Sequence, residues 1–236
     1  MANDIPTVDD FNATRVTSPG QSEMIRQPLY DSQVYPTAGG TQLTFFQQPV
    51  GAGITSALGA VVSSGKTYAD TNMVLPGQLP NGIAFQAESV EVNFLPGKSA
   101  AANTFLPADI SAFAVAAAAT VLGSANDVGT IMQSGWLELN ILAKNYLRDQ
   151  PLMKFPPKCS IDLSAAVASN SATVGEAGQV FTKAVGRPYY LEPKVTIQPT
   201  MNFEVVLKWP GAVATPSGFN GRVIVSLDGY TMRASQ

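Results

Sequence analysis

The sequence predicts an all-β protein, an antiparallel β-sandwich with one inserted helix and long loops. Three stretches support this prediction, because apolar and polar residues alternate along residues 85–94, 136–142 and 202–209. Alternation with a period of two is typical of strands that bury one face. Glycine and proline, 20 and 17 of the 236 residues, separate these stretches with turns and loops.

The last fifth of the chain, residues 189–233, has the clearest pattern. Residues 202–209 and 222–228 read as two closing strands, joined by a loop rich in Pro, Gly, Ser and Asn over residues 210–221. The side chains expected to face the core are Phe203, Val205, Leu207 and Trp209 in the first strand, and Val223, Val225 and Leu227 in the second.

Two inner strands follow the same rule. The inward residues are Val90, Val92 and Phe94 in one and Leu137, Leu139 and Ile141 in the other, and the outward ones are Glu91, Asn93, Glu138 and Asn140. Trp136 is also expected in the core, while Tyr189 and Tyr190 fit an interface or a sheet edge. Shorter strands are expected at residues 42–47, 67–75 (at an edge) and 160–163, and a surface loop at residues 165–179.

One helix is expected at residues 109–122. Its apolar residues recur at helical spacing, among them Ile110, Phe113 and Val121. Asp109 is suited to cap its start and Gly123 to end it. Because this helix lies between predicted strands, we expect it beside the sandwich.

The chain divides into two parts. Residues 1–40 have few apolar residues and several prolines and glycines, so we expect an extended N-terminal arm. The sandwich domain then covers residues 41–236.

Composition excludes several classes of function. The chain has no histidine, a single cysteine (Cys159) and a net charge of −3, without a run of basic residues. This excludes Ser-His-Asp and Cys-His catalysis, the usual zinc sites and a basic nucleic-acid-binding surface. We therefore expect no enzyme activity, no catalytic residue, no cofactor, no metal site and no specific recognition of nucleic acid.

Two local patterns partly match known kinds of site. Ser64-Gly-Lys-Thr has the ending of a phosphate-binding loop, but Ala60 stands where that motif needs its first glycine. Glu88 and Glu91 are close in sequence but lack the setting of a paired acid and nucleophile, so a solvated strand face is the preferred interpretation. Charged residues make up only 13% of the chain, against roughly 25% in typical soluble domains. A surface that packs against copies of itself would tolerate this, and a polar, loop-rich β protein would show it equally.

No secretion signal or membrane span is expected. Residues 1–15 are polar and acidic, and the longest apolar run, residues 112–119, is far shorter than the roughly 20 residues that cross a bilayer. We expect synthesis in the cytoplasm without a cleavable export signal.

The order of these elements resembles the jelly-roll major capsid proteins of tailless icosahedral bacteriophages. The features that carry the resemblance are the extended N-terminal arm, residues 85–97, the strand at residue 136 with its preceding helix, and above all the closing pair. That pair reads Val195-Thr-Ile-Gln-Pro-Thr-Met-Asn-Phe-Glu-Val-Val-Leu-Lys-Trp-Pro and Arg222-Val-Ile-Val-Ser-Leu-Asp-Gly-Tyr-Thr-Met-Arg. The resemblance covers about half of the chain and implies that residues 41–236 form a jelly-roll capsid domain. A compact double jelly roll is the alternative.

The resemblance also implies a function. Such proteins assemble as homo-oligomers, often trimeric capsomers, into an icosahedral shell that encloses the genome, meets other virion proteins at the vertices and often covers an internal membrane. The expected location is therefore the virion. Two alternatives remain: a minor virion protein (a spike, vertex or decoration protein) and a carbohydrate-binding β-sandwich. If residues 1–40 are an arm, their removal should leave a folded subunit that assembles poorly.

Overall fold

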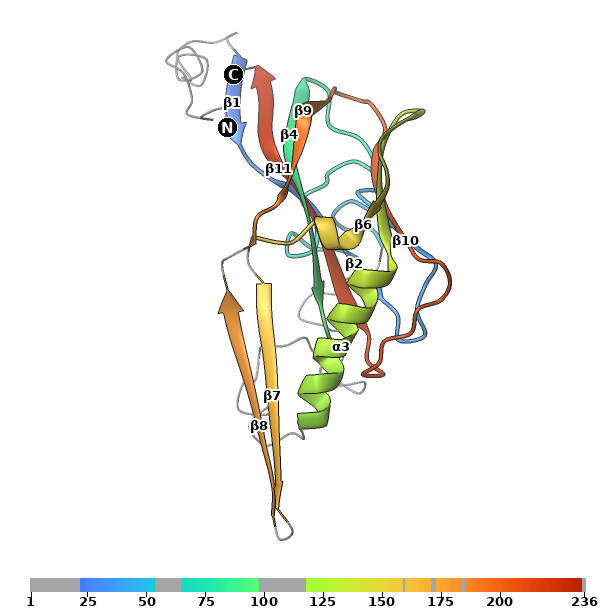
Figure 1. Ribbon diagram of the computed structural model, residues 1–236. Helices are drawn as coiled ribbons and strands as arrows, with labels where there is room; N and C mark the ends of the chain where they lie inside the picture. The colour runs from blue at the N-terminus through green and yellow to red at the C-terminus, as the bar shows by residue number, and fades with distance from the viewer. Residues whose placement is uncertain are drawn as a thin grey trace.

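Two antiparallel β-sheets pack face to face around one hydrophobic core in the computed structural model of this protein (Figure 1). The expected all-β sandwich is confirmed. The structure describes residues 22–53, 65–97, 118–158, 160–170, 173–183 and 186–234.

The described residues form eleven strands, one α-helix and one short 3-10 helix. The strands are β1 (Ser22–Arg26), β2 (Leu29–Tyr35), β3 (Gln42–Phe45), β4 (Ile83–Leu95), β5 (Trp136–Ile141), β6 (Lys144–Pro151), β7 (Ser160–Asn170), β8 (Thr173–Lys183), β9 (Tyr189–Ile197), β10 (Phe203–Lys208) and β11 (Gly221–Ala234). The helices are α3 (Ala118–Ser134) and η2 (Leu152–Lys154).

The larger sheet has the order β1-β11-β4-β9, and β2 also pairs with β11. Residues 230–234 of β11 pair with β1, while residues 221–227 pair with β2. These two strands therefore follow one another along the same edge of β11, whose 14 residues are long enough to hold both.

The smaller sheet has the order β3-β10-β5-β6. The inward positions expected from alternation in β4, β5, β10 and β11 are all buried, which confirms the register of these four strands. The seven inward residues expected in the two closing strands are each at most 3% exposed. The closing strands therefore supply the centre of the core, one in each sheet.

The sandwich includes residues 22–35, which were expected in the arm. β1 and β2 lie within the expected arm, yet both pair with β11. Tyr35 is fully buried, packs edge-on against Trp209 at 5.0 Å and donates a hydrogen bond to the Val213 carbonyl at 2.6 Å. Removal of residues 1–40 would therefore delete two strands of the sheet. A deletion that tests the arm should remove residues 1–21 only.

The helix extends further along the chain than expected. It continues through Gly123 to Ser134, so the expected end at Gly123 is wrong, and residues 109–117 lie outside the described residues. Helical spacing continues after Gly123 and buries Ile131 and Met132 in the core. Gly135 follows the helix, where a Cβ would lie only 2.6 Å from Leu152 and Trp209. The helix ends where close packing requires glycine.

The expected surface loop at residues 165–179 is instead part of a long hairpin. β7 and β8 pair over eleven residues each and form a two-stranded sheet of their own. This hairpin and α3 extend from the same end of the sandwich (Figure 1). The expected edge strand at residues 67–75 is reduced to turns and two isolated bridges, Asp31 to Thr71 and Leu75 to Gln78.

Two residues of β5 differ from expectation in their surroundings. Trp136 was expected in the core, but it pairs with Lys208 on the outer face and is half-buried. Glu138 faces outward as expected, yet it is only 8% exposed, because Lys208 Nζ lies 2.8 and 2.7 Å from its carboxylate oxygens. The outer face of this sheet therefore holds an ion pair between β5 and β10.

Candidate functional site

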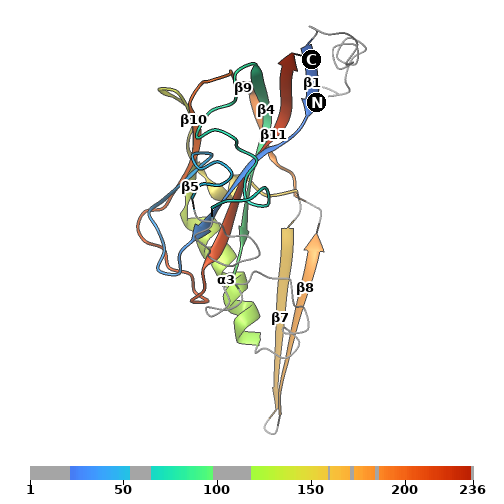
Figure 2. The same cartoon turned by 180° about the vertical axis from the view of Figure 1, so that it is seen from behind.

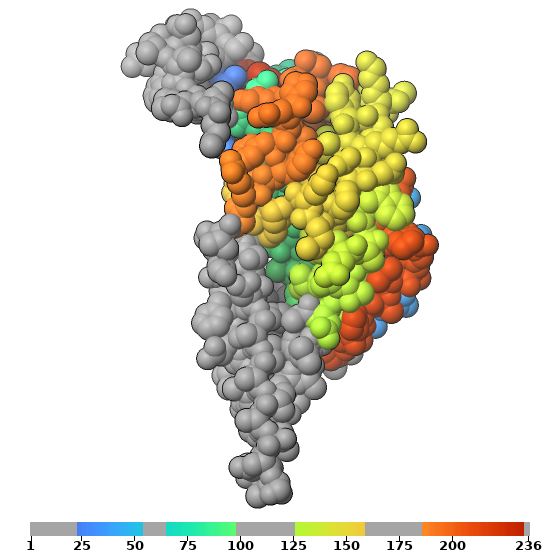
Figure 3. Space-filling view, in the orientation of Figure 1, coloured from blue at the N-terminus to red at the C-terminus, as the bar shows by residue number. Residues whose placement is uncertain are grey.

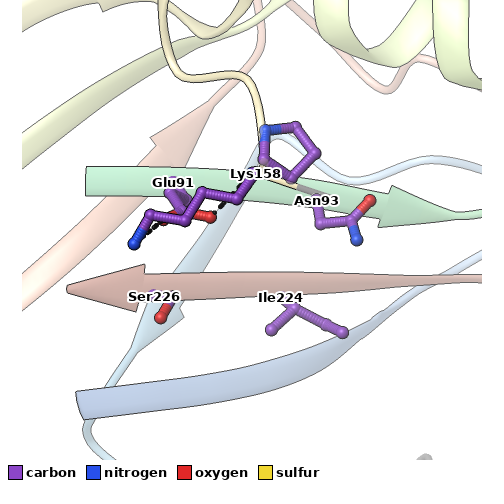
Figure 4. A pocket seen from close by; sticks show the side chains of 6 residues that line it. Glu91, Asn93, Lys158, Ile224 and Ser226 are labelled. Carbon is purple, nitrogen blue, oxygen red and sulfur yellow. Dashed lines mark hydrogen bonds and ion pairs between the residues drawn. The ribbon is translucent and has the colours of Figure 1, made fainter. Parts of the chain in front are cut away.

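The outer face of the larger sheet contains a trough of about 290 Å³. Its floor is formed by Glu91 and Asn93 of β4 and by Ser226 and Ile224 of β11 (Figure 4). Glu91 pairs with Ser226 and Asn93 with Ile224, so these side chains share one face, opposite the core positions between them. Pro157 and Lys158 form a wall of the trough.

The wall is fixed to the sheet by hydrogen bonds. Val92 donates its backbone N–H to the Phe155 carbonyl at 2.9 Å, and Lys158 donates its own N–H to Glu91 Oε2 at 3.0 Å. Phe155 is buried against the ring of Tyr189, with centroids 4.9 Å apart. Gly186, just before β9, donates to the Lys158 carbonyl at 3.2 Å. The trough wall is thus the anchored base of the β7–β8 hairpin.

A cluster of ion pairs extends from the trough across four strands. Lys158 Nζ lies 2.5 Å from Asp228 Oδ2 and 3.3 Å from Glu91 Oε1. Arg26 of β1 reaches the same Asp228 oxygen at 2.8 Å and Glu88 at 3.8 Å. Lys194 of β9 forms an ion pair with Glu88. Three cations and three carboxylates therefore alternate on this face.

A β-bulge brings Glu88 into this cluster. At this residue the pairing of β4 shifts register with both of its neighbours, β11 and β9. On the β11 side, Ala87 pairs with Gly229 while Ser89 pairs with Asp228. A Cβ on Gly229 would lie 1.9 Å from the Gln86 carbonyl oxygen, so only glycine allows the strands to approach this closely. Bulges commonly redirect a side chain in this way.

The ion pairs change the acidity of their members. Burial raises the pKa of Asp228, but hydrogen bonds from Lys158 and Arg26 outweigh it and hold that pKa below its ordinary value. Burial lowers the pKa of Lys158, yet its bonds to Asp228 and Glu91 raise it above the ordinary value. The hydrogen bond to Asp228 likewise raises the pKa of Arg26. The cluster therefore favours the charged forms of its members, which suits a structural role better than proton transfer.

Lys66, from the Ser64-Gly-Lys-Thr stretch, forms a second polar cluster elsewhere. Its Nζ lies 2.7 Å from Asp31 Oδ1, and both side chains are 0% exposed. Asp31 also accepts the backbone N–H of Phe46 at 2.7 Å through Oδ2. Burial raises the pKa of Asp31, and Lys66 opposes that shift. An ammonium group held in this way is not free to bind a phosphate.

A turn beside Lys66 is fastened by a third set of contacts. Asp70 Oδ2 accepts the backbone N–H and hydroxyl of Thr67 at 2.9 and 3.0 Å. Arg222 of β11 lies 3.3 Å from Asp70 Oδ1 and donates to the Ala69 carbonyl at 2.6 Å and to the Ser32 hydroxyl at 3.1 Å. Burial lowers the pKa of Arg222, partly offset by Asp70. The turn is therefore fixed to β2 and β11.

Comparison with protein-family models, curated proteins and solved structures finds no match for this chain. Across the described ranges, no three His, Cys, Asp or Glu side chains are placed to hold a metal ion. In the same part of the chain, no helix has the length and apolar character needed to cross a membrane.

Glu88, Glu91 and Lys66 belong to the two local sequence patterns, but no site residue was predicted from them. The structure places Glu88 and Glu91 in one ion-pair cluster, with side chains 8% and 14% exposed, and places Lys66 in another. The solvated strand face preferred for the two glutamates is thus largely covered. Their partners Arg26, Lys158 and Lys194 lie far away in sequence, so no local signal could have identified the cluster.

Proposed function

We propose that the sandwich is a single jelly roll and that the protein is the major capsid subunit of a tailless icosahedral bacteriophage. In this proposal the chain self-assembles, through trimeric capsomers, into the shell that encloses the genome, and its location is the virion. One observation carries the proposal, namely the order in which the strands pair. With β1 set aside, the strands of the two large sheets pair first with eighth, second with seventh, third with sixth and fourth with fifth.

This nested pairing is the pattern of a jelly roll. A chain of eight strands folded back on itself pairs in this order, and rolling the resulting ribbon places alternate pairs in opposite sheets. The sheet orders β2-β11-β4-β9 and β3-β10-β5-β6 fit that description. Two jelly rolls need about sixteen strands, so the described strands favour one roll over two. Jelly rolls with eight strands recur in viral capsids and in lectins.

The positions of the insertions also support a tiling subunit. Because successive strands are antiparallel, the connections β2–β3, β4–β5, β6–β9 and β10–β11 leave the same end of the sandwich. The helix α3 lies in the second of these connections and the β7–β8 hairpin in the third. Large elaborations at one end leave the flanks of the sandwich free for lateral contact.

The scarcity of charge supports lateral association between subunits. Only 13% of the residues are charged, and many of the described charges form ion pairs within the chain. A surface with few unpaired charges loses little hydration energy when another protein covers it. Closed symmetry then repeats each contact many times, so that weak contacts support a stable shell.

Expression of the full chain alone tests the proposal. Size-exclusion chromatography with light scattering should show trimers or larger species, and negative-stain microscopy should show rings, sheets or shells. A monomer at every concentration tested would contradict self-assembly. In particles, hundreds of copies would identify the shell protein, whereas a few copies would identify a spike, vertex or decoration protein.

The carbohydrate-binding alternative has a distinct signature. It requires an exposed aromatic platform, and the exposed aromatic residues of the described chain are Tyr68, Tyr146 and Tyr190. They lie on three separate elements, the segment after Lys66, β6 and β9. A monomer that binds glycans on an array would favour this alternative over the shell.

A further inference from the structure

Among the described residues, one flank of the sandwich has no exposed charge. We define this neutral flank as residues 27–53 and 65–82, which comprise β2, β3 and the segments next to them. Its only charged residues are Asp31, Lys66 and Asp70, whose exposed fractions are 0, 2 and 0%. In Figure 2 the β2 strand and the teal segment that includes residues 65–82 lie on the side of the molecule turned toward the viewer.

The charges of the neutral flank are neutralised inside the protein. Lys66 pairs with Asp31, and Asp70 pairs with Arg222 of β11, whose side chain is 11% exposed. Burying these groups carries a desolvation penalty that a surface pair would avoid. Because these charges are paired inside the protein, the surface of the flank has polar but uncharged side chains. The cores of protein interfaces are similarly depleted of charge.

The neutral flank exposes large apolar side chains on a fixed backbone. Tyr68, Val74 and Leu75 are 70, 64 and 39% exposed. The backbone around them is held to β2 and to the segment after β3, since Tyr30 Oη donates to the Tyr68 carbonyl at 2.5 Å, Val50 N–H to the Met73 carbonyl at 3.0 Å and Gly77 N–H to the Phe46 carbonyl at 2.8 Å. A surface already ordered in the free protein loses less entropy on binding.

The opposite flank is different in charge. In the two sheets β9 and β6 lie at the edges away from β2 and β3. Figure 3 shows β9, β6 and η2 together on one face of the molecule. There Arg148 and Asp149 have side chains 82 and 61% exposed, so that flank carries charge into solvent. It also exposes Leu142 and Tyr146, at 58 and 47%, and these serve as a matched control.

We infer that the neutral flank binds a second copy of this chain. Each copy has a net charge of −3, so copies repel one another wherever charged faces approach. The neutral flank is a face through which two like-charged molecules meet without bringing exposed charges together. A nucleic acid or another strongly charged partner would find no counter-charge there. The inference rests on the proposed self-assembly and assigns a surface to it.

Charge placed on the neutral flank tests the inference. The triple variant Tyr68→Lys, Val74→Lys, Leu75→Lys should weaken self-association by at least about 30-fold in sedimentation velocity, because ammonium groups would be buried without partners. The matched variant Leu142→Lys, Tyr146→Lys should change it by less than about 3-fold. Circular dichroism melts should show both variants folded, since all five residues are exposed.

Salt dependence gives a second measurement on the unmodified protein. Association through an uncharged surface should hold or strengthen between about 0.05 and about 1 M salt, because screening removes only the repulsion between copies. A triple variant that associates as tightly as the wild type, or an association lost at high salt, would overturn the inference and leave the proposed shell function intact. A wild-type protein that never associates would instead contradict the proposed function itself.

Discussion

The larger sheet carries two ion-pair systems with the same chemistry and opposite exposure. On the neutral flank the side chains of Lys66 and Asp31 are both 0% exposed, whereas on the outer face the side chain of Lys158 is 46% exposed beside that of Asp228 at 10%. Each system fastens a non-strand segment to the sheet: the first holds the turn at residues 66–71, the second the base of the β7–β8 hairpin. The difference shows that a loop can be fixed by charges without presenting any to solvent.

The largest effect is expected from breaking the buried pair. Lys66→Met leaves the Asp31 carboxylate buried without its cation and should lower the free energy of unfolding by about 3–5 kcal/mol, measured by urea denaturation. The control is Lys154→Met, whose ammonium group lies in solvent 3.4 Å from Gln150. The control should cost less than about 0.5 kcal/mol. A loss below about 1 kcal/mol for Lys66→Met would contradict the importance of the buried pair.

Removing both charges should cost less than removing one. Asp31→Asn keeps an oxygen for the Phe46 N–H but carries no charge, so in the Lys66→Met background it should restore about 1–3 kcal/mol of stability. A double-mutant cycle in denaturant measures this coupling. Strictly additive losses would show that the two side chains act independently.

The outer-face cluster should respond less. Asp228→Asn removes the carboxylate that accepts from Lys158 and Arg26, and it should cost about 1–2 kcal/mol in urea denaturation, because both cations are about half exposed and screened by solvent. Asn93→Asp, in the same trough, adds a carboxylate and serves as the control for a general charge effect. A cost above that of Lys66→Met would reverse the comparison between the two systems.

The same variant gives a pH prediction. The pKa of Asp228 is lower in the folded protein than its ordinary value of about 3.9, so its stabilising contribution is present above that value and is lost as the pH falls through the folded pKa. Lys158 has a raised pKa, so its contribution is present below about pH 10 and is lost at higher pH. The difference in melting temperature between wild type and Asp228→Asn should therefore be constant from pH 8 to 5 and shrink below about pH 4. A difference that grows on acidification would show the opposite sign of linkage.

The smallest effect is expected at an exposed pair between β1 and β11. Arg233 Nε lies 2.7 Å from Glu23 Oε2, and the arginine side chain is 51% exposed. Arg233→Gln should change the free energy of unfolding by less than about 1 kcal/mol, and the change should vanish at high salt. Denaturation at low and high salt measures this, and a larger effect that persists in salt would mean that packing of the arginine stem dominates.

Half-buried strands were predictable because burial imposes a period of two on their sequence. This identified β4, β5, β10 and β11 with their inward residues. β2 was missed because its inward face includes Asp31, a charged residue that is tolerated only because Lys66 lies opposite. The β7–β8 hairpin was missed because its sequence is dominated by small and polar residues. The end of α3 was misplaced because Gly123 lies inside the helix.

The candidate site was not predictable from local pattern. Arg26 and Asp228 are 202 positions apart, and only the pairing of β1 with β11 brings them together. The neutral flank, by contrast, leaves a trace in composition, because residues 27–87 contain only Asp31, Lys66 and Asp70 as charged residues. The sequence could indicate a surface poor in charge, but only the fold shows that the remaining charges are turned inward.

The nested pairing also constrains the order in which the chain can fold during synthesis. β2 and β3 are made early, but their partners β11 and β10 are made last. Until those strands leave the ribosome, the early strands have no sheet to join, and their exposed edges are open to pairing with other nascent chains. The innermost pair, β5 with β6, is joined by a tight turn and can form first. Folding would then proceed outward from this hairpin, so a ribosome stalled before β10 should present a chain that depends on chaperones.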